Sequence, residues 1–225
     1  MNTGTGQVTE LILKDGYRQL RVSCPPNLIP APGQYLLASE GPDTLMPVPL
    51  FHTDSVPGGF IAVASIPVSW IPGVKLYLRG SLGRGFTLPF SARKVGLIAL
   101  DNSPARLEGM IGPALKQEAA VVLACSFNPE DLPNEVEVQP LSSVRDILAW
   151  ADYVAFDVAR ENLHQLGELL STDDQLPNAS GAQVLIHTSL PCGGVADCGV
   201  CSVSLKSGWK LACKEGPVFA WRELL

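Results

Sequence analysis

The sequence predicts an α+β protein of several small domains, in the order antiparallel β-barrel, α/β sheet domain and small C-terminal domain with clustered cysteines. Three observations lead to this fold class. Short β-prone runs fill residues 1–92, apolar strands alternate with helical patterns over residues 93–184, and four of the six cysteines lie within residues 185–225. A chain of 225 residues suits two or three small units.

The first domain shows β-prone runs separated by turns rich in proline and glycine. These runs lie at residues 8–14, 17–24, 33–39, 60–66 and 74–80. Strands this short and this regularly spaced favour a small antiparallel barrel.

The second domain alternates apolar runs with amphipathic ones. Buried strands are expected at residues 94–100, 120–127, 136–141, 153–159 and 182–188, with helices at residues 105–117, 143–151 and 161–170. Alternation of this kind predicts a sheet of mainly parallel strands with helices on its faces. The polar stretch at residues 171–181 is the expected linker or long loop.

Composition limits the function classes. The net charge is −6 and no run of Lys or Arg appears, so we expect neither nucleic acid nor an anionic membrane as a partner. The sequence begins without an apolar signal core and contains no apolar stretch of about 18 to 20 residues, which predicts a soluble cytoplasmic protein. Apolar residues make up 46% and charged residues 17%, which fits either a thoroughly buried core or a surface for a partner protein.

The four C-terminal cysteines have the spacing of an iron–sulfur ligand set. They are Cys192, Cys198, Cys201 and Cys213. Three lie close together on a glycine-rich loop and the fourth follows later, much as in plant-type [2Fe–2S] proteins. A zinc site is the alternative, but structural zinc usually takes two C-x2-C pairs, whereas here one pair is flanked by single cysteines. Gly193, Gly194 and Gly199 would let the loop curl with its N–H groups toward the cluster. Two β-prone runs beside these cysteines, residues 202–208 and 209–215, predict a hairpin turning at Ser207 and Gly208.

Three segments extend this reading to a family resemblance. APGQY at residues 31–35 and GSLGRGF at 80–86 resemble motifs of ferredoxin-reductase-type flavin barrels, and ACKEGPVF at 212–219 is similar to the last-cysteine segment of the class 1B dihydroorotate dehydrogenase electron-transfer subunit. The resemblance implies a subunit that accepts electrons on FAD, usually from NADH, and relays them through a [2Fe–2S] cluster. Its partner would be an FMN-containing dehydrogenase that interconverts dihydroorotate and orotate in pyrimidine synthesis. The four cysteines named above would be the cluster ligands.

Two segments depart from that family. Where its barrel has an Arg-Pro-x-Ser motif near the flavin and its pyrophosphate, residues 48–51 are Val-Pro-Leu-Phe, which argues against tight FAD binding. Where its sheet domain has a glycine-rich turn, Asp101 follows the first strand, and NADH binding is therefore not expected. Arg106 could offset one charge, but a helix start with Asn102 or Ser103 as N-cap and Pro104 at the first helical position explains this segment better.

The remaining candidates add little chemistry. His52, His164 and His187 form no ligand spacing, and Cys24 and Cys125 fit buried structural thiols. Trp209 and Trp221 flank the last cysteine and could shield it, contact a partner or simply pack.

Two hypotheses follow, in addition to a zinc-binding scaffold. The first is an electron-transfer subunit, rather than a complete enzyme, that serves an FMN-containing catalytic dehydrogenase. The second is a non-catalytic structural or relay subunit of another oxidoreductase complex that has lost flavin and NADH binding. Val195, Val200 and Trp209, around the cysteine loop, are the expected contact residues.

Overall fold

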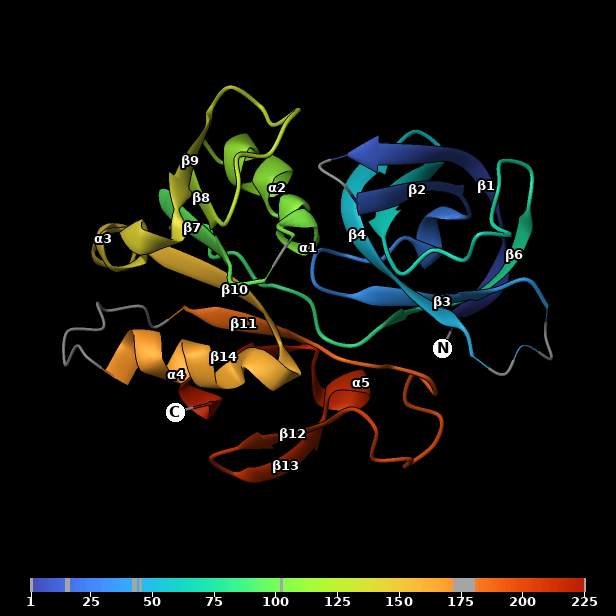
Figure 1. Cartoon of the computed structure of the whole chain (residues 1–225). Coiled ribbons are helices and arrows are strands. Elements are labelled where there is room, and N and C mark those ends of the chain that lie inside the picture. The colour runs from blue at the N-terminus through green and yellow to red at the C-terminus, as the bar shows by residue number, and fades with distance from the viewer. Residues whose placement is uncertain are drawn as a thin grey trace.

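The structure is a computed structural model that describes residues 2–14, 17–41, 44, 46–101, 103–171 and 181–224. It has a β-barrel, a sheet flanked by helices, and a C-terminal segment that runs along both (Figure 1). The expected linker at residues 171–181 lies almost wholly outside the described residues. Within those residues, no helix is both long and apolar enough to cross a membrane.

The first six described strands close into a barrel in the order β1-β2-β5-β4-β3-β6, so the predicted antiparallel barrel is confirmed. Their bounds are β1 (Asn2–Lys14), β2 (Tyr17–Ser23), β3 (Tyr35–Ser39), β4 (Val48–Val56), β5 (Gly59–Val63) and β6 (Lys75–Leu82), with a 3-10 helix at Pro26–Leu28. Leu20, Leu36, Leu50, Phe60 and Trp70 are buried inside. The expected strands omitted β4, whose residues Pro49 and His52 interrupt the apolar pattern.

The second sheet has the strand order β14-β11-β10-β7-β8-β9. Its strands are β7 (Lys94–Ala99), β8 (Ala120–Cys125), β9 (Val136–Pro140), β10 (Tyr153–Ala159), β11 (Gln183–His187) and β14 (Val218–Ala220). Neighbouring strands from β9 to β11 are parallel, as predicted, while β14 runs antiparallel to β11. Strand β14 comes from the C-terminal segment, which therefore ends within this sheet.

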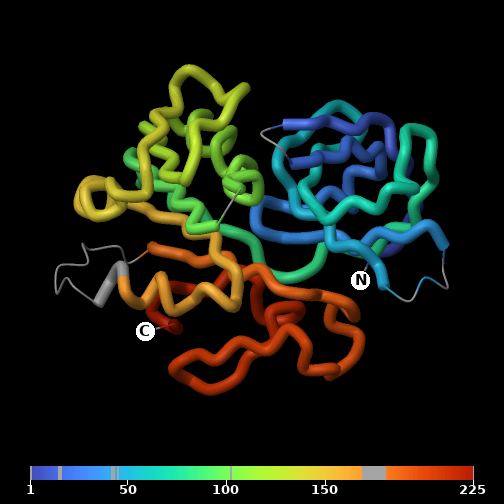
Figure 2. Tube along the Cα trace, in the orientation of Figure 1, coloured from blue at the N-terminus to red at the C-terminus, as the bar shows by residue number. Residues whose placement is uncertain are grey.

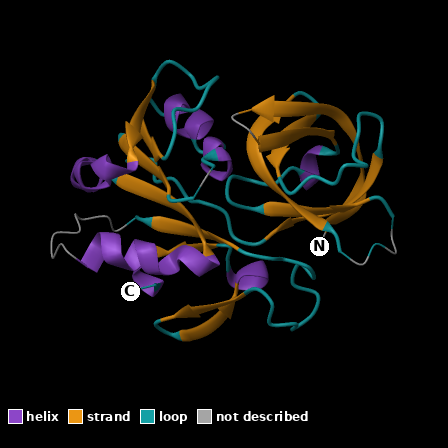
Figure 3. Cartoon of the chain, viewed as in Figure 1, coloured by secondary structure: helices purple, strands orange, loops and turns teal. Residues whose placement is uncertain are grey.

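Helices cover both faces of this sheet (Figure 3). They are α1 (Ala105–Glu108), α2 (Ile111–Lys116), α3 (Val144–Trp150) and α4 (Leu163–Ser171), with 3-10 turns at Leu141–Ser143 and Arg160–Asn162. Leu107 of α1 and the apolar residues of α2 pack with one core, while Ala105 of α1 packs with the other, together with apolar residues of α3 and α4. One helix was expected over residues 105–117, but it is broken between α1 and α2 around Gly109.

The C-terminal segment contains the hairpin β12 (Ser202–Leu205) and β13 (Gly208–Leu211), then α5 (Ala212–Glu215), β14 and a 3-10 turn at Trp221–Glu223. Leu205 pairs with Gly208, so the turn residues are Lys206 and Ser207, one position earlier than predicted. The expected second strand ends at Leu211 because the following residues are helical. Trp221 is buried and stacks on Phe156 with ring centroids 5.7 Å apart, which makes it a core residue.

Candidate metal centre

The four predicted ligand cysteines lie between β11 and β14. Cys192 and Cys198 occupy the loop after β11, Cys201 directly precedes β12, and Cys213 is in α5. Cys201 and Cys213 are buried, Cys192 is partly exposed and Cys198 is exposed. All six cysteines of the chain are described and all carry free thiols; Cys24 and Cys125 are buried away from this group, as expected.

The four thiols lie next to one another. The Sγ atoms of Cys192 and Cys198 are 3.7 Å apart. The Cys213 thiol also lies near those of Cys201 and Cys192, which contribute to the rise of its pKa. Two sulfurs bound at about 2.3 Å to one tetrahedral metal ion would be separated by about 3.8 Å. The spacing of the first pair therefore fits two ligands of one metal ion.

The thiols form a loose group rather than a finished coordination shell. Among the described residues, no set of three or more His, Cys, Asp or Glu side chains already has the geometry of a metal site. The donor set nevertheless suits a cluster, because four soft sulfur ligands on one loop and one short helix are what iron–sulfur and structural zinc centres require. The structure thus brings the predicted ligands near one another, and both metal binding and the identity of the metal stay predictions.

The thiols differ in their ease of ionisation. Burial raises the pKa of the Cys213 thiol to about 12, and the neighbouring Cys201 and Cys192 add to the rise. Burial also raises the pKa of Cys192, but backbone hydrogen bonds at Ala196 and Gly194 and the thiols of Cys198 and Cys213 outweigh it, so that the net pKa is lowered. Cys192 is therefore the more readily ionised of the two and the better initial ligand, since metals bind the thiolate form.

The cysteine loop lies directly on the barrel. Gly193 has φ +50°, and a Cβ atom there would be 2.5 Å from Leu37 Cδ1, 2.7 Å from Arg79 Nη2 and 3.0 Å from Leu82 Cδ1. Only glycine accepts this backbone conformation and this close approach together without strain. The loop position is thus fixed by contact with strands β3 and β6.

Side chains from both domains bind main-chain carbonyls of the cysteine segment. From the barrel, Arg79 Nη2 donates to the Cys192 oxygen at 2.6 Å and Tyr35 Oη donates to the Cys213 oxygen at 3.2 Å. From the carboxyl end of β10, Arg160 Nη1 donates to the Val200 oxygen at 2.6 Å. Figure 2 shows the C-terminal chain running along the barrel and the sheet, where these contacts form.

The three segments that carried the family resemblance meet at this junction. Gln34 Nε2 donates to the Gly83 oxygen at 3.0 Å, and the Phe86 N–H donates to the Pro32 oxygen at 2.9 Å. A Cβ atom at Gly33, where φ is +83°, would lie 2.7 Å from Val218 Cγ2. The resembling motifs therefore form one packed contact beside the helix that carries the last cysteine.

Asp101, which stands where the resembling family has a glycine-rich nucleotide-binding turn, is bound by other residues of the chain. The Asp101 carboxylate accepts hydrogen bonds from Asn162 Nδ2 at 2.7 Å, from His187 Nε2 at 2.9 Å, and from the Ala159 N–H. Burial raises the pKa of Asp101, but these hydrogen bonds outweigh it and hold the pKa below its ordinary value. His187, at the end of β11, thus binds a carboxylate and is not directed to the cysteines.

Arg106 is also engaged within the chain. Its Nε donates to both carboxylate oxygens of the fully buried Asp157, at 2.9 and 3.1 Å. The helix start expected here is shifted by one residue: Pro104 is the N-cap of α1, and Ser103 Oγ accepts from the Ala105 N–H at 3.3 Å. Asn102 lies outside the described residues.

The barrel position expected to contact a flavin has no cation. Val48 and Pro49 begin β4, paired with Ala38 and Leu37 of β3. Pro49 lines a cavity of about 720 Å³ between the barrel and the sheet, in which Arg160 and His187 are the basic residues. Both already bind other groups of the chain, so a pyrophosphate would have to compete for them.

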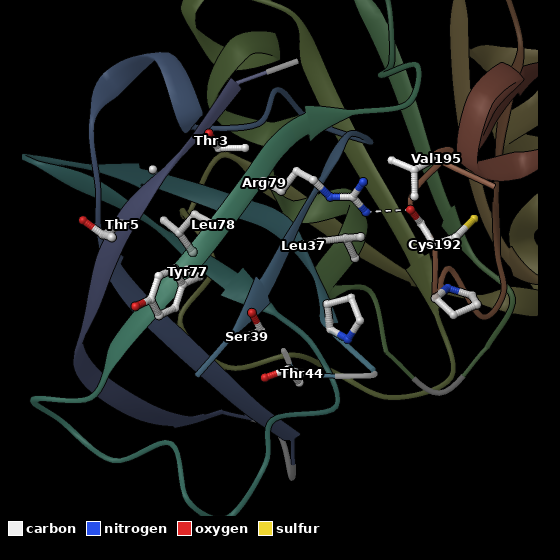
Figure 4. Close-up of a pocket in the computed structure, with 13 residues that line it drawn as sticks. Thr3, Thr5, Leu37, Ser39, Thr44, Tyr77, Leu78, Arg79, Cys192 and Val195 are labelled. Atoms are coloured by element: carbon white, nitrogen blue, oxygen red, sulfur yellow. Dashed lines mark hydrogen bonds between the residues drawn. The ribbon is translucent and has the colours of Figure 1, made fainter. Parts of the chain in front are cut away.

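A second cavity, of about 610 Å³, lies between the barrel and the cysteine loop. Thr3, Thr5, Ser39, Thr44 and Tyr77 line it with hydroxyl groups, and Arg79, Cys192 and Val195 line it where the barrel meets the cysteine loop (Figure 4). Arg79, Tyr35 and Arg160 were not predicted from the sequence as residues of this site. Tyr35 falls inside the APGQY motif, but no sequence pattern marks the two arginines.

The expected partner-contact residues all face solvent. Val195, Val200 and Trp209 are 63%, 44% and 75% exposed, which is high for apolar side chains of this size. They lie on the loop between the cysteines and on the hairpin that follows.

No family model matches the sequence. The structure is similar to that of an NADH-dependent reduced ferredoxin-NADP oxidoreductase studied for flavin-based electron bifurcation, with a TM-score of 0.75 and 15% identity over 99% of this chain and 90% of that one. It is also similar to a ferredoxin reductase in carbazole 1,9a-dioxygenase (TM-score 0.58, 16% identity, 84% of this chain and 67% of that one). A third similar structure is the H286L mutant of ferredoxin-NADP+ reductase from Plasmodium falciparum (TM-score 0.59, 10% identity, 83% and 96%).

At these identities the similarity establishes the fold alone: the chain has the barrel and sheet architecture of the ferredoxin reductases. The match to the first of these structures covers 99% of this chain and therefore extends over residues 192–213, whereas the matches to the other two cover 84% and 83% of it.

Proposed function

We propose that the chain is an electron-transfer subunit whose four C-terminal cysteines hold a [2Fe–2S] cluster and exchange single electrons with a flavin-containing dehydrogenase. The observation that carries the proposal is the grouping of four free thiols: the Sγ atoms of Cys192 and Cys198 are 3.7 Å apart, and the Cys213 thiol lies near those of Cys201 and Cys192. The reductase-type fold supports an oxidoreductase role, and the resemblance of residues 212–219 favours the class 1B dihydroorotate dehydrogenase system of pyrimidine synthesis as the setting.

The residues present fit such a group. When bound, the cluster would supply one-electron transfer. Cys201 and Cys213 provide ligands from the buried side, and Cys192 and Cys198 provide them from the solvent side. Cys198 and the nearby Val200 are exposed, so a partner protein could approach the cluster closely there. Electron exchange requires such a short separation between donor and acceptor.

We propose further that the chain does not take hydride directly from NADH. The carboxylate of Asp101 occupies the end of the first parallel strand, and it is held by His187 and Asn162. An anionic pyrophosphate placed there would meet a negative charge instead of glycine N–H groups. The neighbouring cation, Arg106, is bound to Asp157. FAD binding is expected to be substoichiometric or absent, because Val48 stands where the resembling family has arginine.

Metal and sulfide analysis tests the cluster. Protein purified without oxygen should contain about two irons and two acid-labile sulfides per chain. Cys198→Ser should abolish both, whereas Cys24→Ala, at a buried thiol of the barrel, should retain them. Stoichiometric zinc without sulfide in the wild-type protein would disprove the proposal and support the zinc-binding scaffold.

The second candidate function is a non-catalytic structural or relay subunit of another oxidoreductase complex, which has lost flavin and nucleotide binding. The internal contacts of Asp101 and Arg106 favour it specifically. Stopped-flow absorbance with NADH, combined with flavin quantitation, separates the candidates. If the protein binds FAD tightly at one per chain and NADH reduces it rapidly, the second candidate is excluded and the chain does accept hydride from NADH. A flavin-free protein that still holds the cluster would support the second candidate.

The partner is tested by recovery of the native complex. We expect an FMN-containing dehydrogenase to accompany the chain, with contact through the face that carries Val195, Val200 and Trp209. Val200→Asp should weaken the complex without changing iron content, because this side chain is exposed and apolar. If the native protein elutes alone and reduces a soluble acceptor at physiological rates, the subunit assignment is wrong.

A further inference from the structure

Cys201 and Cys213 are brought together by a small hairpin. Its strands, β12 and β13, form their own two-stranded sheet (Figure 1). The Ala212 N–H donates to the Cys201 oxygen at 3.0 Å, so Cys201 lies opposite the residue that precedes Cys213. A two-stranded hairpin is only marginally stable by itself in water. The position of Cys201 therefore depends on the contacts that tie this hairpin to the rest of the molecule.

Arg160 binds the backbone on both sides of Cys201. It follows β10 directly, at the start of a 3-10 turn. Its Nη1 donates to the Val200 oxygen at 2.6 Å and, over a longer distance, to the Ser202 oxygen at 3.4 Å. This nitrogen carries two N–H groups, so one can serve each carbonyl. The guanidinium thus bridges the residue before Cys201 and the residue after it.

The backbone around Cys201 is therefore held from two directions. The carbonyl of Cys201 binds Ala212 of the hairpin segment, while the two flanking carbonyls bind Arg160 of the sheet domain. The Cys201 residue is only 1% exposed and belongs to the same core as Ala212 and Cys213. A closely packed side chain has no free space in which to compensate for a backbone shift. Movement of this segment would therefore displace the thiol.

We propose that Arg160 is a positioning residue of the metal centre, which fixes the Cys201 thiol beside Cys213 by holding the flanking carbonyls at the end of β10. This inference rests on the proposed function, because it takes Cys201 to be a ligand. Residues that orient the ligands of a metal centre influence it without touching the metal. The sheet domain, in addition to the barrel, thereby determines the geometry of the cysteine group.

Two further variants separate this role from the general stability of the hairpin. Lys210 lies on β13, and its Nζ is 2.6 Å from the carboxylate of Glu223. Lys210→Gln therefore removes a basic side chain and a contact of the same hairpin, as Arg160→Ala does, but leaves the carbonyls beside Cys201 bound. Arg160→Lys is the conservative variant, because an ammonium group has three N–H donors and can still serve both carbonyls.

The first measurement is alkylation of Cys201 in the reduced, metal-free full-length protein. A buried thiol reacts when its segment opens locally, so the reaction with iodoacetamide, followed by mass spectrometry at each cysteine, reports how firmly Cys201 is held. Arg160→Ala should accelerate alkylation of Cys201 about threefold to tenfold, as expected for lost hydrogen bonds. Arg160→Lys and Lys210→Gln should stay close to wild type, and Cys125, buried elsewhere, should be unchanged in all variants.

The second measurement is visible circular dichroism of the anaerobically purified proteins at equal iron content, which reports the arrangement of the ligands around the cluster. Arg160→Ala should change this spectrum, Arg160→Lys should restore it, and Lys210→Gln should match wild type. A hairpin that is merely less stable would leave the spectrum of the loaded protein unchanged. The inference is wrong if Arg160→Ala matches wild type in either measurement, or if Lys210→Gln accelerates alkylation of Cys201 as much.

Failure of the proposed function gives a different result. Wild-type protein purified without oxygen that contains neither iron nor sulfide would overturn the cluster, whatever the variants do. Alkylation of the metal-free chain would still decide whether Arg160 holds Cys201 in place, because both hydrogen bonds of Arg160 are made within the chain itself.

Discussion

Replacing Gly193 by alanine isolates the contact between the cysteine loop and the barrel. The residue has φ +50°, so a side chain there costs about 1–2 kcal/mol in backbone strain. The added carbon would also lie 2.5 Å from Leu37 Cδ1 and 3.0 Å from Leu82 Cδ1. These leucines are only 2% and 9% exposed and have little space to move, so overpacking adds about 1–3 kcal/mol. The expected destabilisation is about 2–5 kcal/mol in total.

Gly199 provides the control within the same loop. It has φ +72°, but an added carbon there would have its nearest neighbour, Ser202 Oγ, at 3.8 Å. Gly199→Ala therefore carries the backbone strain without the overlap, and the two variants should differ by about 1–3 kcal/mol. For a chain of this size, Gly193→Ala should melt about 2–12 °C below Gly199→Ala by circular dichroism. Equal melting temperatures, or a lower one for Gly199→Ala, would refute the close packing of loop and barrel.

Three other substitutions test separate parts of the structure. Burial raises the pKa of Asp101, but hydrogen bonds from Asn162, His187 and Ala159 outweigh burial, and the net pKa lies below 3.8. The ionised carboxylate therefore stabilises the folded state above about pH 4. This stability is lost as the pH falls through the folded-state pKa. Urea unfolding between about pH 2 and 5 should thus show a flatter acid loss for Asp101→Asn, and parallel curves would contradict this. Tyr35→Phe removes the hydrogen bond to the Cys213 carbonyl and should cost about 1 kcal/mol in urea unfolding; an unchanged midpoint would mean that this bond contributes nothing. Gly167→Ala, in the middle of α4 with no atom within 4 Å of the added carbon, should stabilise by about 1 kcal/mol, and a lower melting temperature would count against the helix.

Runs of apolar residues predicted strands correctly where every residue of the strand is buried. Strand β10 was expected at residues 153–159 and is found at Tyr153–Ala159, because every residue of it is buried and apolar residues dominate. Strand β4 was missed because its second half, His52 to Ser55, is polar, although His52 and Thr53 are buried in the barrel wall. The polar start of β1 was missed for a similar reason: residues 2–7 owe their strand conformation to pairing with β6 rather than to their own composition.

The candidate site was predictable only where residues close together in the sequence form it. The short spacings from Cys192 to Cys201 confine three thiols to one loop, so their proximity could be expected. Contacts that depend on how the barrel meets this loop could not be expected. Arg79 is separated from Cys192 by 113 positions in the sequence, and nothing around it marks a residue that binds a cysteine carbonyl.

Strand β14 makes the cysteine segment an insertion between two adjacent strands. Leu185 of β11 pairs with Val218 of β14, so the chain leaves the sheet edge and returns to the same place after residues 188–217. Antiparallel neighbours can be joined by a two-residue turn. The whole excursion could therefore be excised and replaced by a tight turn without rethreading the sheet. Evolution, or a protein engineer, could in the same way add or remove the cysteine-bearing module while the underlying sheet stays intact.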